Sequence, residues 1–241
     1  WLSLVGGWPF FLLVLLLAQV GLWEYCRLTR LPLTLQLWCF FVATGLLLTL
    51  HIQGLGYSGT VIALGVVLLL GIVLFGFDRY GFEEAGTALL GVCYVPLLFG
   101  HILLLRRLPL GARFTVLIFV LTWAVDTAAF FVGSLFGRRQ LKPDVSPRKT
   151  WAGALAGLIT GAAVFVWASP LVKLKMGPAL VLGLLLALAA LVGDLMESAL
   201  KRLAQVKDAG NILPGHGGIL DRFDALLLVA PTAYFLLNWW Y

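Results

Sequence analysis

Charged side chains are scarce in this sequence. Asp, Glu, Lys and Arg together account for 28 of the 241 residues, or 12%, against about 25% in soluble domains. Hydrophobic residues make up 61%, which is more than a soluble globule of this size could bury. These proportions exclude a soluble enzyme, a disordered chain and a nucleic-acid binder with a basic surface. They indicate an integral membrane protein.

Cysteine is also rare, and the charge that is present is unbalanced. Cys26, Cys39 and Cys93 lack the spacing of a metal or redox motif, so we expect them to be small apolar residues of helices. The 17 Lys and Arg exceed the 11 Asp and Glu. In a membrane protein such an excess usually lies in cytoplasmic loops. No nucleic-acid partner is therefore expected.

Long apolar runs make up most of the chain. A helix needs about 20 apolar residues to cross a membrane, and Leu-rich runs of this length indicate helices, not barrel strands. The sequence predicts an all-α polytopic membrane helical bundle of about eight transmembrane helices, in a single integral membrane domain over residues 1–241. The predicted spans are 9–27, 35–52, 58–77, 85–105, 113–137, 151–172, 178–203 and 225–241.

Lys and Arg also predict an orientation. With the loop after the first span inside, the inner segments carry 12 of these residues and the outer segments carry five. The outer five are Arg106, Arg107, Arg113, Lys173 and Lys175. The three arginines argue locally against this orientation, and one wrongly predicted span between 58 and 113 would explain them. In either orientation segments 138–150 and 201–224 share one side, because two spans separate them.

Small residues recur at helical spacing in two of the predicted spans. Gly153, Gly157 and Gly161 form a tandem G-x-x-x-G pattern. Ala129, Gly133 and Gly137 follow Asp126 on one helical face. Stripes of this kind are typical of close helix packing, which is the role we expect for them.

The few charges are concentrated. Fifteen of the 28 lie within 138–150 and 194–224, and Asp126 lies inside an otherwise apolar span. A lone intramembrane carboxyl is either a hydrogen-bonded structural group or a functional one, and the cost of charge in lipid favours function.

One predicted helix carries a polar face. Asp194, Glu197, Ser198 and Lys201 are spaced i, i+3, i+4 and i+7, which places them on one side of a helix. Asp194 lies about two turns inside the apolar segment, so a solvated surface stripe explains it poorly. Metal coordination and a buried ion-pair network are the two remaining interpretations.

The segment that follows is rich in glycine and charge. Its glycines allow the backbone to approach a ligand and to cradle phosphate oxygens. Lys207 and Arg222 supply positive charge for phosphates, and Asp221 and Asp224 supply oxygen ligands suited to Mg²⁺.

A third polar element is the segment 146–150, which follows Arg138 and Arg139. An ordinary positive-inside loop would explain its charge but not its hydroxyl groups. Cations and hydroxyls for phosphates, together with carboxylates for a metal, are the groups used in phosphoryl or nucleotidyl transfer.

These segments resemble a known enzyme family. The pattern Ser198-x-x-Lys201-Arg202-x4-Lys207-Asp208-x-Gly210-x2-Leu213-Pro214-x-His216-Gly217-Gly218-x2-Asp221-Arg222-x-Asp224 resembles the signature of phosphatidate cytidylyltransferases, also called CDP-diacylglycerol synthases. Further similarity lies in Trp23-Glu24-Tyr25, Asp126-Thr127, Ser146-Pro147-x-Lys149-Thr150-Trp151 and Gly193-Asp194. Phe130, Ser134 and Ala152 stand where the family pattern has Tyr, Arg and Glu.

The resemblance implies a reaction. CTP and phosphatidic acid would give CDP-diacylglycerol and pyrophosphate for phospholipid biosynthesis, with Mg²⁺ as cofactor and a second metal ion left open. Residues 1–112 would form N-terminal helices, and 113–241 the catalytic helices and cytoplasmic loops. The resemblance further implies one more helix before Trp1, a homodimer, and an active site on the cytoplasmic side of a bacterial-type membrane.

The resemblance also implies roles for individual residues. The expected catalytic residues are Asp194, Asp221, Lys201 and Arg222. The expected substrate-binding residues are Ser146, Arg148, Lys149, Thr150, Ser198, Arg202, Lys207, His216, Gly217 and Gly218. The expected metal ligands are Asp194 and Asp221, with Asp224 and Glu197 near them, and Asp126 and Asp208 give support. His216 is expected to donate a hydrogen bond or to organise its loop, not to act as a base.

Two other functions fit some of these features. A related CTP-dependent enzyme could act on another lipid, as an isoprenoid-alcohol kinase or an archaeal-lipid cytidylyltransferase does. A transporter could use Asp126 and Asp194 for ion coupling. A transporter predicts polar residues along a path through both leaflets, whereas here they crowd one side.

Overall fold

The computed structural model describes residues 2–206, 210 and 217–240. Its longer helices are α2 (Gly7–Leu28), α3 (Leu33–Ile52), α4 (Ser58–Phe75), α5 (Phe82–Val92), α6 (Leu98–Arg107), α7 (Gly111–Phe136), α8 (Trp151–Ala168), α9 (Met176–Leu203) and α10 (Leu220–Trp240). Its short elements are α1 (Leu2–Val5), η1 (Gly54–Tyr57), η2 (Cys93–Leu97), β1 (Gln140–Lys142) and β2 (Ser146–Thr150).

The predicted all-α membrane bundle is confirmed. In the described part of the chain, seven helical segments are long and apolar enough to cross a membrane, with α5, η2 and α6 counting as one segment. The eighth predicted span, 225–241, is helical as α10 but is not among these seven. Helix α10 begins five residues before the predicted span, and its start carries Asp221, Arg222 and Asp224, which lowers the apolar character of that end.

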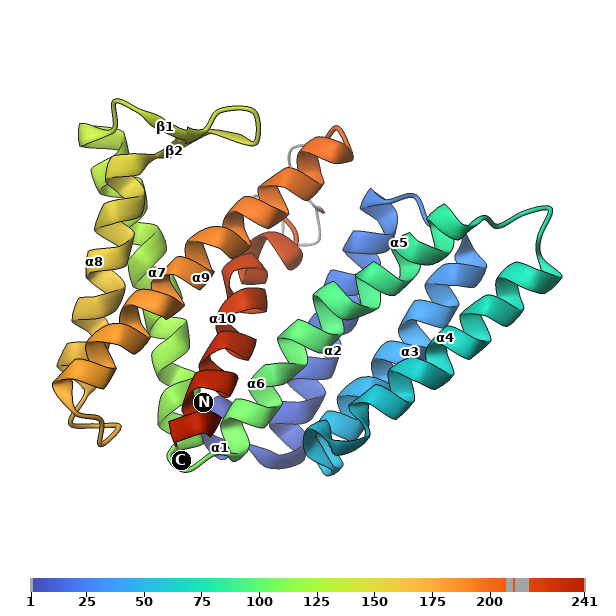
Figure 1. Cartoon of the computed structure of the whole chain (residues 1–241), viewed down its shortest axis with the longest axis horizontal. Coiled ribbons are helices and arrows are strands. Elements are labelled where there is room, and N and C mark those ends of the chain that lie inside the picture. Colours follow the sequence, from blue (N-terminus) through green and yellow to red (C-terminus); the bar gives the residue numbers. More distant parts are fainter. Residues whose placement is uncertain (1, 207–209, 211–216, 241) are drawn as a thin grey trace.

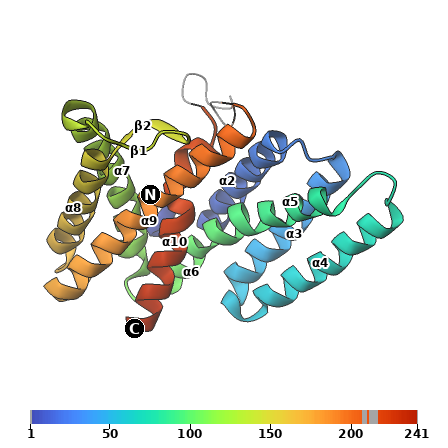
Figure 2. The same cartoon turned by 45° about the horizontal axis from the view of Figure 1, so that its top comes forward.

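The helices are arranged in two groups joined by a central pair. Helices α7, α8 and α9 lie together on one side and α2 to α5 on the other, with α6 and α10 between them (Figure 1). The turned view gives the same arrangement (Figure 2). Helix α9 packs against both α8 and α10, and α10 packs against α6. The interior is apolar, and large side chains such as Phe75 and Trp167 are exposed on the outside, as expected for surfaces that face lipid.

The glycine stripe of α8 packs against two neighbouring helices, as predicted. A Cβ atom added to Gly153 would lie 2.6 Å from the carbonyl oxygen of Ala129 in α7. At Gly161 it would lie 2.5 Å from Cβ of Ala187 in α9. Only residues without a side chain allow the helix backbones to come this close.

One end of the bundle collects the polar segments. The described parts of 138–150 and 201–224 lie at the same end, as predicted (Figures 1 and 2). Strand β2 contacts α9, and the end of α9 contacts the start of α10. The sequence did not predict strands in the segment 138–150. Residues 140–150 form an antiparallel hairpin that pairs Gln140 with Thr150 and Lys142 with Ser146.

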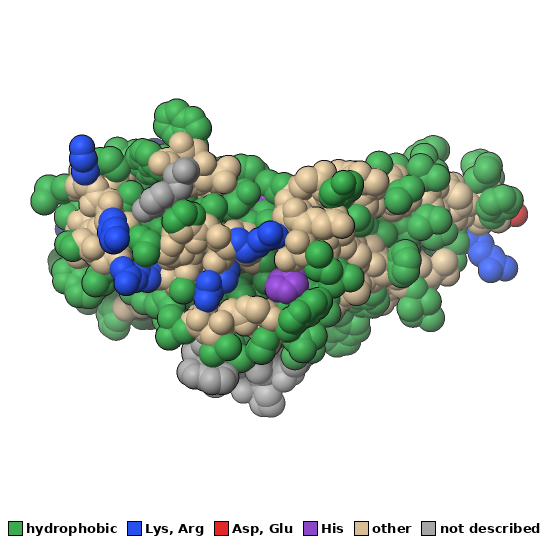
Figure 3. Space-filling model, turned by 90° about the horizontal axis from the view of Figure 1, so that it is seen from below, with side chains coloured by type: hydrophobic (Ala, Val, Ile, Leu, Met, Phe, Trp, Pro, Cys, Tyr) green, Lys and Arg blue, Asp and Glu red, His purple; other side chains and the backbone are tan. Residues whose placement is uncertain are grey.

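The opposite end carries the arginines that disagreed with the predicted orientation. The suggestion of a wrongly predicted span between 58 and 113 was incorrect, because every helix there is present. Arg106 donates to the carbonyl oxygens of Ser3 and Leu4, Arg107 to those of Leu50 and His51, and Arg113 to that of Leu171. Viewed from this end, Lys and Arg are dispersed over a largely hydrophobic face (Figure 3). The three arginines therefore stabilise this end of the bundle by donating hydrogen bonds to backbone carbonyl oxygens.

Candidate functional site

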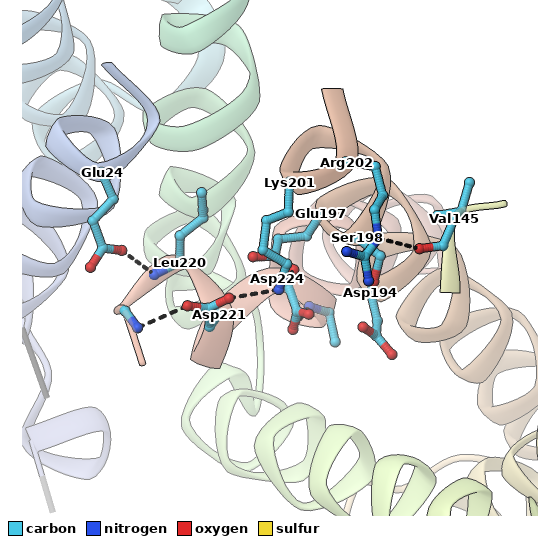
Figure 4. A network of polar contacts seen from close by, with 12 residues as sticks. Glu24, Val145, Asp194, Glu197, Ser198, Lys201, Arg202, Leu220, Asp221 and Asp224 are labelled. Atoms are coloured by element: carbon cyan, nitrogen blue, oxygen red, sulfur yellow. Dashed lines mark hydrogen bonds and ion pairs between the residues drawn. The ribbon is translucent and has the colours of Figure 1, made fainter. Parts of the chain in front are cut away.

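The polar face of α9 carries a chain of ion pairs that reaches α10 (Figure 4). Glu197 is 1% exposed, and its Oε2 lies 2.5 Å from Nζ of Lys201. The same Nζ lies 2.7 Å from Oδ1 of Asp221, in the first turn of α10. Lys201 therefore holds one carboxylate from each helix. Of the two interpretations open from the sequence, the structure contains the ion-pair network.

A glycine allows α9 and α10 to meet at this network. A Cβ atom on Gly193 would lie 2.7 Å from the carbonyl oxygen of Asp224 and 3.1 Å from Cα of Ala225. The close approach brings Asp224 near Asp194, Glu197 and Asp126, whose charges all act on it. The backbone N–H of Ala225 donates to Oδ1 of Asp224 at 2.6 Å. Carboxylates that are far apart in the sequence thus form one acidic cluster: Asp126, Asp194, Glu197, Asp221 and Asp224.

The hairpin contacts the same polar face of α9, through Asp194 and Ser198. Nζ of Lys149 lies 2.7 Å from Oδ1 of Asp194 and donates to Oγ of Ser198 at 3.3 Å. Nε of Arg202 donates to the carbonyl oxygen of Val145 at 3.2 Å. These contacts place the basic residues of the hairpin beside the acidic cluster. The sequence predicted both groups but could not show that they touch.

Thr150 has a local structural role at the start of α8. Its Oγ1 accepts a hydrogen bond from the backbone N–H of Gly153 at 3.2 Å, which caps the helix. The same hydroxyl would be 3.1 Å from a Cβ atom on Gly133, so it also packs against α7. This contact fixes the angle at which the hairpin joins the membrane helices.

An open cavity of about 950 Å³ lies between α7, α8, α9 and the hairpin. Its basic rim is formed by Arg138, Arg139, Arg148 and Lys149, and Ser146 and Thr150 also line it. Its less polar side includes Ala129, Phe130, Gly133, Ala154 and Leu191, and both Asp126 and Asp194 face it. Phe130 and Ser134, two of the departures from the family pattern, line this cavity, whereas Ala152 is not among its lining residues.

Glu24 joins the site from α2. It is completely buried, and its carboxylate accepts hydrogen bonds from the backbone N–H groups of Ile219 at 3.0 Å and Leu220 at 2.7 Å. Next to them, the N–H of Gly218 donates to Oδ2 of Asp221 at 2.8 Å. Sequence reasoning gave Glu24 no role. The available signal was a lone carboxyl in an apolar span, the same argument that drew attention to Asp126.

The remaining predicted site residues divide into two sets. Arg222 is exposed in the first turn of α10, and Gly217 adopts a left-handed backbone with φ of 80° beside Asp221. Lys207, Asp208 and His216 lie outside the described residues. Among the residues that the structure does describe, no three His, Cys, Asp or Glu side chains form a group that could hold a metal ion. The assignment of metal ligands stays a prediction.

The fold and this site together define a polytopic membrane protein with a charged site at one end of its helix bundle. The chain belongs to the cytidylyltransferase family, whose model matches residues 1–240. It is 40% identical over 187 residues to the phosphatidate cytidylyltransferase of Bacillus subtilis (strain 168), a match that covers 76% of this chain and 69% of that protein. It is 37% identical over 180 residues to the phosphatidate cytidylyltransferase of Staphylococcus aureus (strain COL), covering 74% and 68%. The resemblance seen in the sequence is thereby confirmed.

Proposed function

We propose that this protein transfers the cytidylyl group of CTP to phosphatidic acid and releases CDP-diacylglycerol and pyrophosphate. The family and the names of its relatives support this reaction. The observation that carries it is that Lys149 pairs with Asp194 in the lining of a cavity with a basic rim, while Lys201, on the same polar face of α9, pairs with Glu197 and Asp221. Two anionic substrates need such cations close together, because their mutual repulsion must be cancelled before they can react.

The cavity suits the phosphate end of a membrane lipid. Its basic rim offers guanidinium and ammonium groups, which bind phosphate oxygens well. Phe130 and Leu191 on its less polar side would contact the glycerol and the first part of the acyl chains. We assign the lipid phosphate to the hairpin residues Ser146, Arg148 and Lys149, and the triphosphate to the side of Lys201, Arg202 and Arg222.

The reaction is an in-line displacement at phosphorus. An oxygen of the phosphatidate phosphate forms a bond to the α-phosphorus of CTP, and the bond from that phosphorus to the bridging oxygen of pyrophosphate breaks. The attacking phosphate is already largely dianionic near pH 7, since its second pKa is about 6. No general base is then required, and the protein's task is to hold the two phosphates aligned.

Carboxylate oxygens, which the acidic cluster supplies, are ligands that Mg²⁺ prefers, although no three of the described side chains are grouped closely enough to hold the ion as they stand. Among the described residues, ion pairs within the cluster reach Asp194, Glu197 and Asp221, but neither Asp126 nor Asp224 has one. Oε1 of Glu197 is buried and accepts no hydrogen bond from the described chain. Asp194 and Asp221 would hold the ion, with Asp224 and Glu197 beside them. When bound, it would neutralise phosphate charge that the lysines leave uncompensated.

The site belongs on the cytoplasmic side of the membrane in this proposal. The count of Lys and Arg favours that orientation, and the three arginines that opposed it each bind backbone carbonyls at the other end. CTP is a cytoplasmic metabolite, so a site facing this side can receive it from water. The homodimer implied by the resemblance stays a prediction.

The test is a reaction of the purified protein with CTP, Mg²⁺ and phosphatidic acid. CTP labelled in the α-phosphate should transfer its label to the lipid, and CTP labelled in the γ-phosphate should release it as pyrophosphate. Transfer of the γ label to a lipid would instead identify a kinase. Activity only with a different lipid phosphate would identify another cytidylyltransferase of the family. Solute movement in liposomes without CTP consumption would favour the transporter.

A further inference from the structure

Glu24 forms a cross-link between the N-terminal helices and the start of α10. Its two carboxylate oxygens accept from two consecutive backbone N–H groups, those of Ile219 and Leu220. The contact spans almost the whole chain and lies at the end of the bundle that holds the acidic cluster (Figure 4). Glu24 has no ion pair with any residue that the structure describes.

The surroundings of Glu24 are shaped to receive its carboxylate. A Cβ atom on Gly218 would lie 2.5 Å from Oε1 of Glu24, so only glycine leaves room for the carboxylate there. Gly210 is equally close to Glu24 and leaves no room for a side chain. The negative charge also meets the positive end of the α10 helix dipole, which favours a carboxylate at this position.

Stability alone gives a weak reason for a carboxylate here. Glu24 is completely buried within a membrane span, and removing a charge from water is costly even when hydrogen bonds are available. An apolar side chain would avoid that cost but would leave the backbone N–H groups of Ile219 and Leu220 without this acceptor. What the carboxylate adds is a fixed position for the first turn of α10, because α9 ends at Leu203 and α10 begins 17 residues later, at Leu220.

That first turn carries the residues that matter for the reaction. Asp221 follows directly after Leu220, and it accepts from Gly218 on one oxygen and from Lys201 on the other. A shift of the turn would therefore move Asp221 relative to Lys201 and Glu197. A displacement of about 1 Å can lower a rate about 100-fold even when it begins away from the reacting atoms.

We propose that Glu24 is a positioning residue for cytidylyl transfer, which holds the first turn of α10 so that Asp221 stays aligned with Lys201. This inference rests on the proposed function. The hydrogen bonds of Glu24 go to Ile219 and Leu220 and not to the hairpin that we assign to the lipid phosphate, so its variants should change the rate of the chemical step more than the binding of phosphatidic acid.

The decisive variant is Glu24→Gln, which keeps the size of the side chain. Its carbonyl oxygen can still accept one hydrogen bond, but its NH₂ group would face the second backbone N–H, donor against donor. We expect kcat to fall about 100-fold with the KM for phosphatidic acid changed by less than about threefold. Glu24→Asp keeps the charge on a shorter side chain and should restore part of kcat.

The matched control is Tyr25→Phe, which removes one hydrogen bond from the neighbouring residue of α2. The Tyr25 hydroxyl donates to the carbonyl oxygen of Thr87 at 3.0 Å and does not reach α10. This variant should keep kcat within about twofold, since its contact lies outside the site. A similar loss in Tyr25→Phe and Glu24→Gln would overturn the inference, because it would reflect general damage to α2.

Hydrogen exchange tests the contact independently of activity. The amides of Ile219 and Leu220 should exchange at least about tenfold faster in Glu24→Gln than in the wild type, because their acceptor is weakened. Unchanged exchange, or faster exchange with kcat preserved, would contradict the positioning role. If the wild type makes no CDP-diacylglycerol, the proposed function is wrong, and the positioning role is wrong with it. The exchange experiment does not depend on activity, so it still decides whether Glu24 holds the start of α10.

Discussion

Lys149 and Asp194 meet at 2.7 Å, although one is in the hairpin and the other is well inside α9. Both residues line the cavity, and the pair holds the basic hairpin against α9. Both side chains are partly exposed, at 22% and 34%. The contact therefore remains accessible to a ligand that would compete for either partner.

Replacing Lys149 by Met should remove activity without unfolding the protein. The variant loses the cation closest to Asp194, and we expect the rate to fall about 100-fold, because preorganised charge contributes strongly to phosphoryl chemistry. The partial exposure of the pair limits the change in unfolding free energy to about 1 kcal/mol. Activity and thermal unfolding in detergent would be measured together.

The control is Lys142→Met in the same hairpin. Lys142 lies 3.8 Å from Asp144, and both side chains are largely exposed. This variant should behave like the wild type in both assays. An equal loss of activity in the two variants would mean that the charge of the hairpin as a whole matters, and not the contact with Asp194.

Asp221→Asn should abolish turnover in a folded protein. The amide can still accept a hydrogen bond from Gly218, but it cannot pair as an anion with Lys201 or act as a strong ligand of Mg²⁺. We expect the rate to fall at least about 1000-fold. Asp144→Asn, at an exposed position of the hairpin, is the charge-matched control. Mg²⁺-dependent activity retained in Asp221→Asn would exclude the assigned role.

Removing divalent cations should stop the reaction reversibly. The acidic cluster has more carboxylates than lysines, so it keeps a negative charge. The bound phosphates of the two substrates would increase that negative charge further. Treatment with EDTA should lower the rate to background, and Mg²⁺ should restore it, whereas Na⁺ at equal ionic strength should not. Full turnover in EDTA would show that Lys149, Lys201 and the arginines suffice.

Gly161→Leu should destabilise the bundle far from the charged site. A side chain at Gly161 would overlap Ala187 and the backbone of Gly183 in α9, so the two helices would have to move apart. Overpacking of this kind costs about 1–3 kcal/mol. Gly71→Leu is the matched control, since a side chain there would meet no atom within 4 Å. Thermal unfolding should separate the two variants by several degrees, and equal melting temperatures would contradict the packing described for α8.

Much of the architecture could be predicted from the sequence. The apolar runs predicted every long helix to within a few residues, because hydrophobic length is a local property. The face formed by Asp194, Glu197, Ser198 and Lys201 followed from helical periodicity within one element. The glycine stripe of α8 predicted close packing for the same reason.

What the sequence did not predict depends on contacts between elements. The hairpin has strands of three and five residues with Pro147 in one of them, so it lacks the alternation that signals a strand. No local pattern connects Lys149 with Asp194 or Lys201 with Asp221. The contact of Glu24 is the one that the sequence predicts least. Its partners are backbone amides near the opposite end of the chain, and every residue type except proline has such an amide.

The length of α9 sets the depth of the chemistry in the membrane. Its 28 residues extend about 42 Å at 1.5 Å per residue, which exceeds the roughly 30 Å of hydrocarbon in a bilayer. Counted from Met176, Asp194 lies about 27 Å and Lys201 about 38 Å along the axis. If α9 enters the hydrocarbon at Met176 and runs along the membrane normal, Asp194 lies just inside the opposite edge and Lys201 lies beyond it, at the level of the lipid headgroups. A phosphatidate molecule could react there with its tails still among their neighbours, so that only the nucleotide and pyrophosphate would cross between water and the protein.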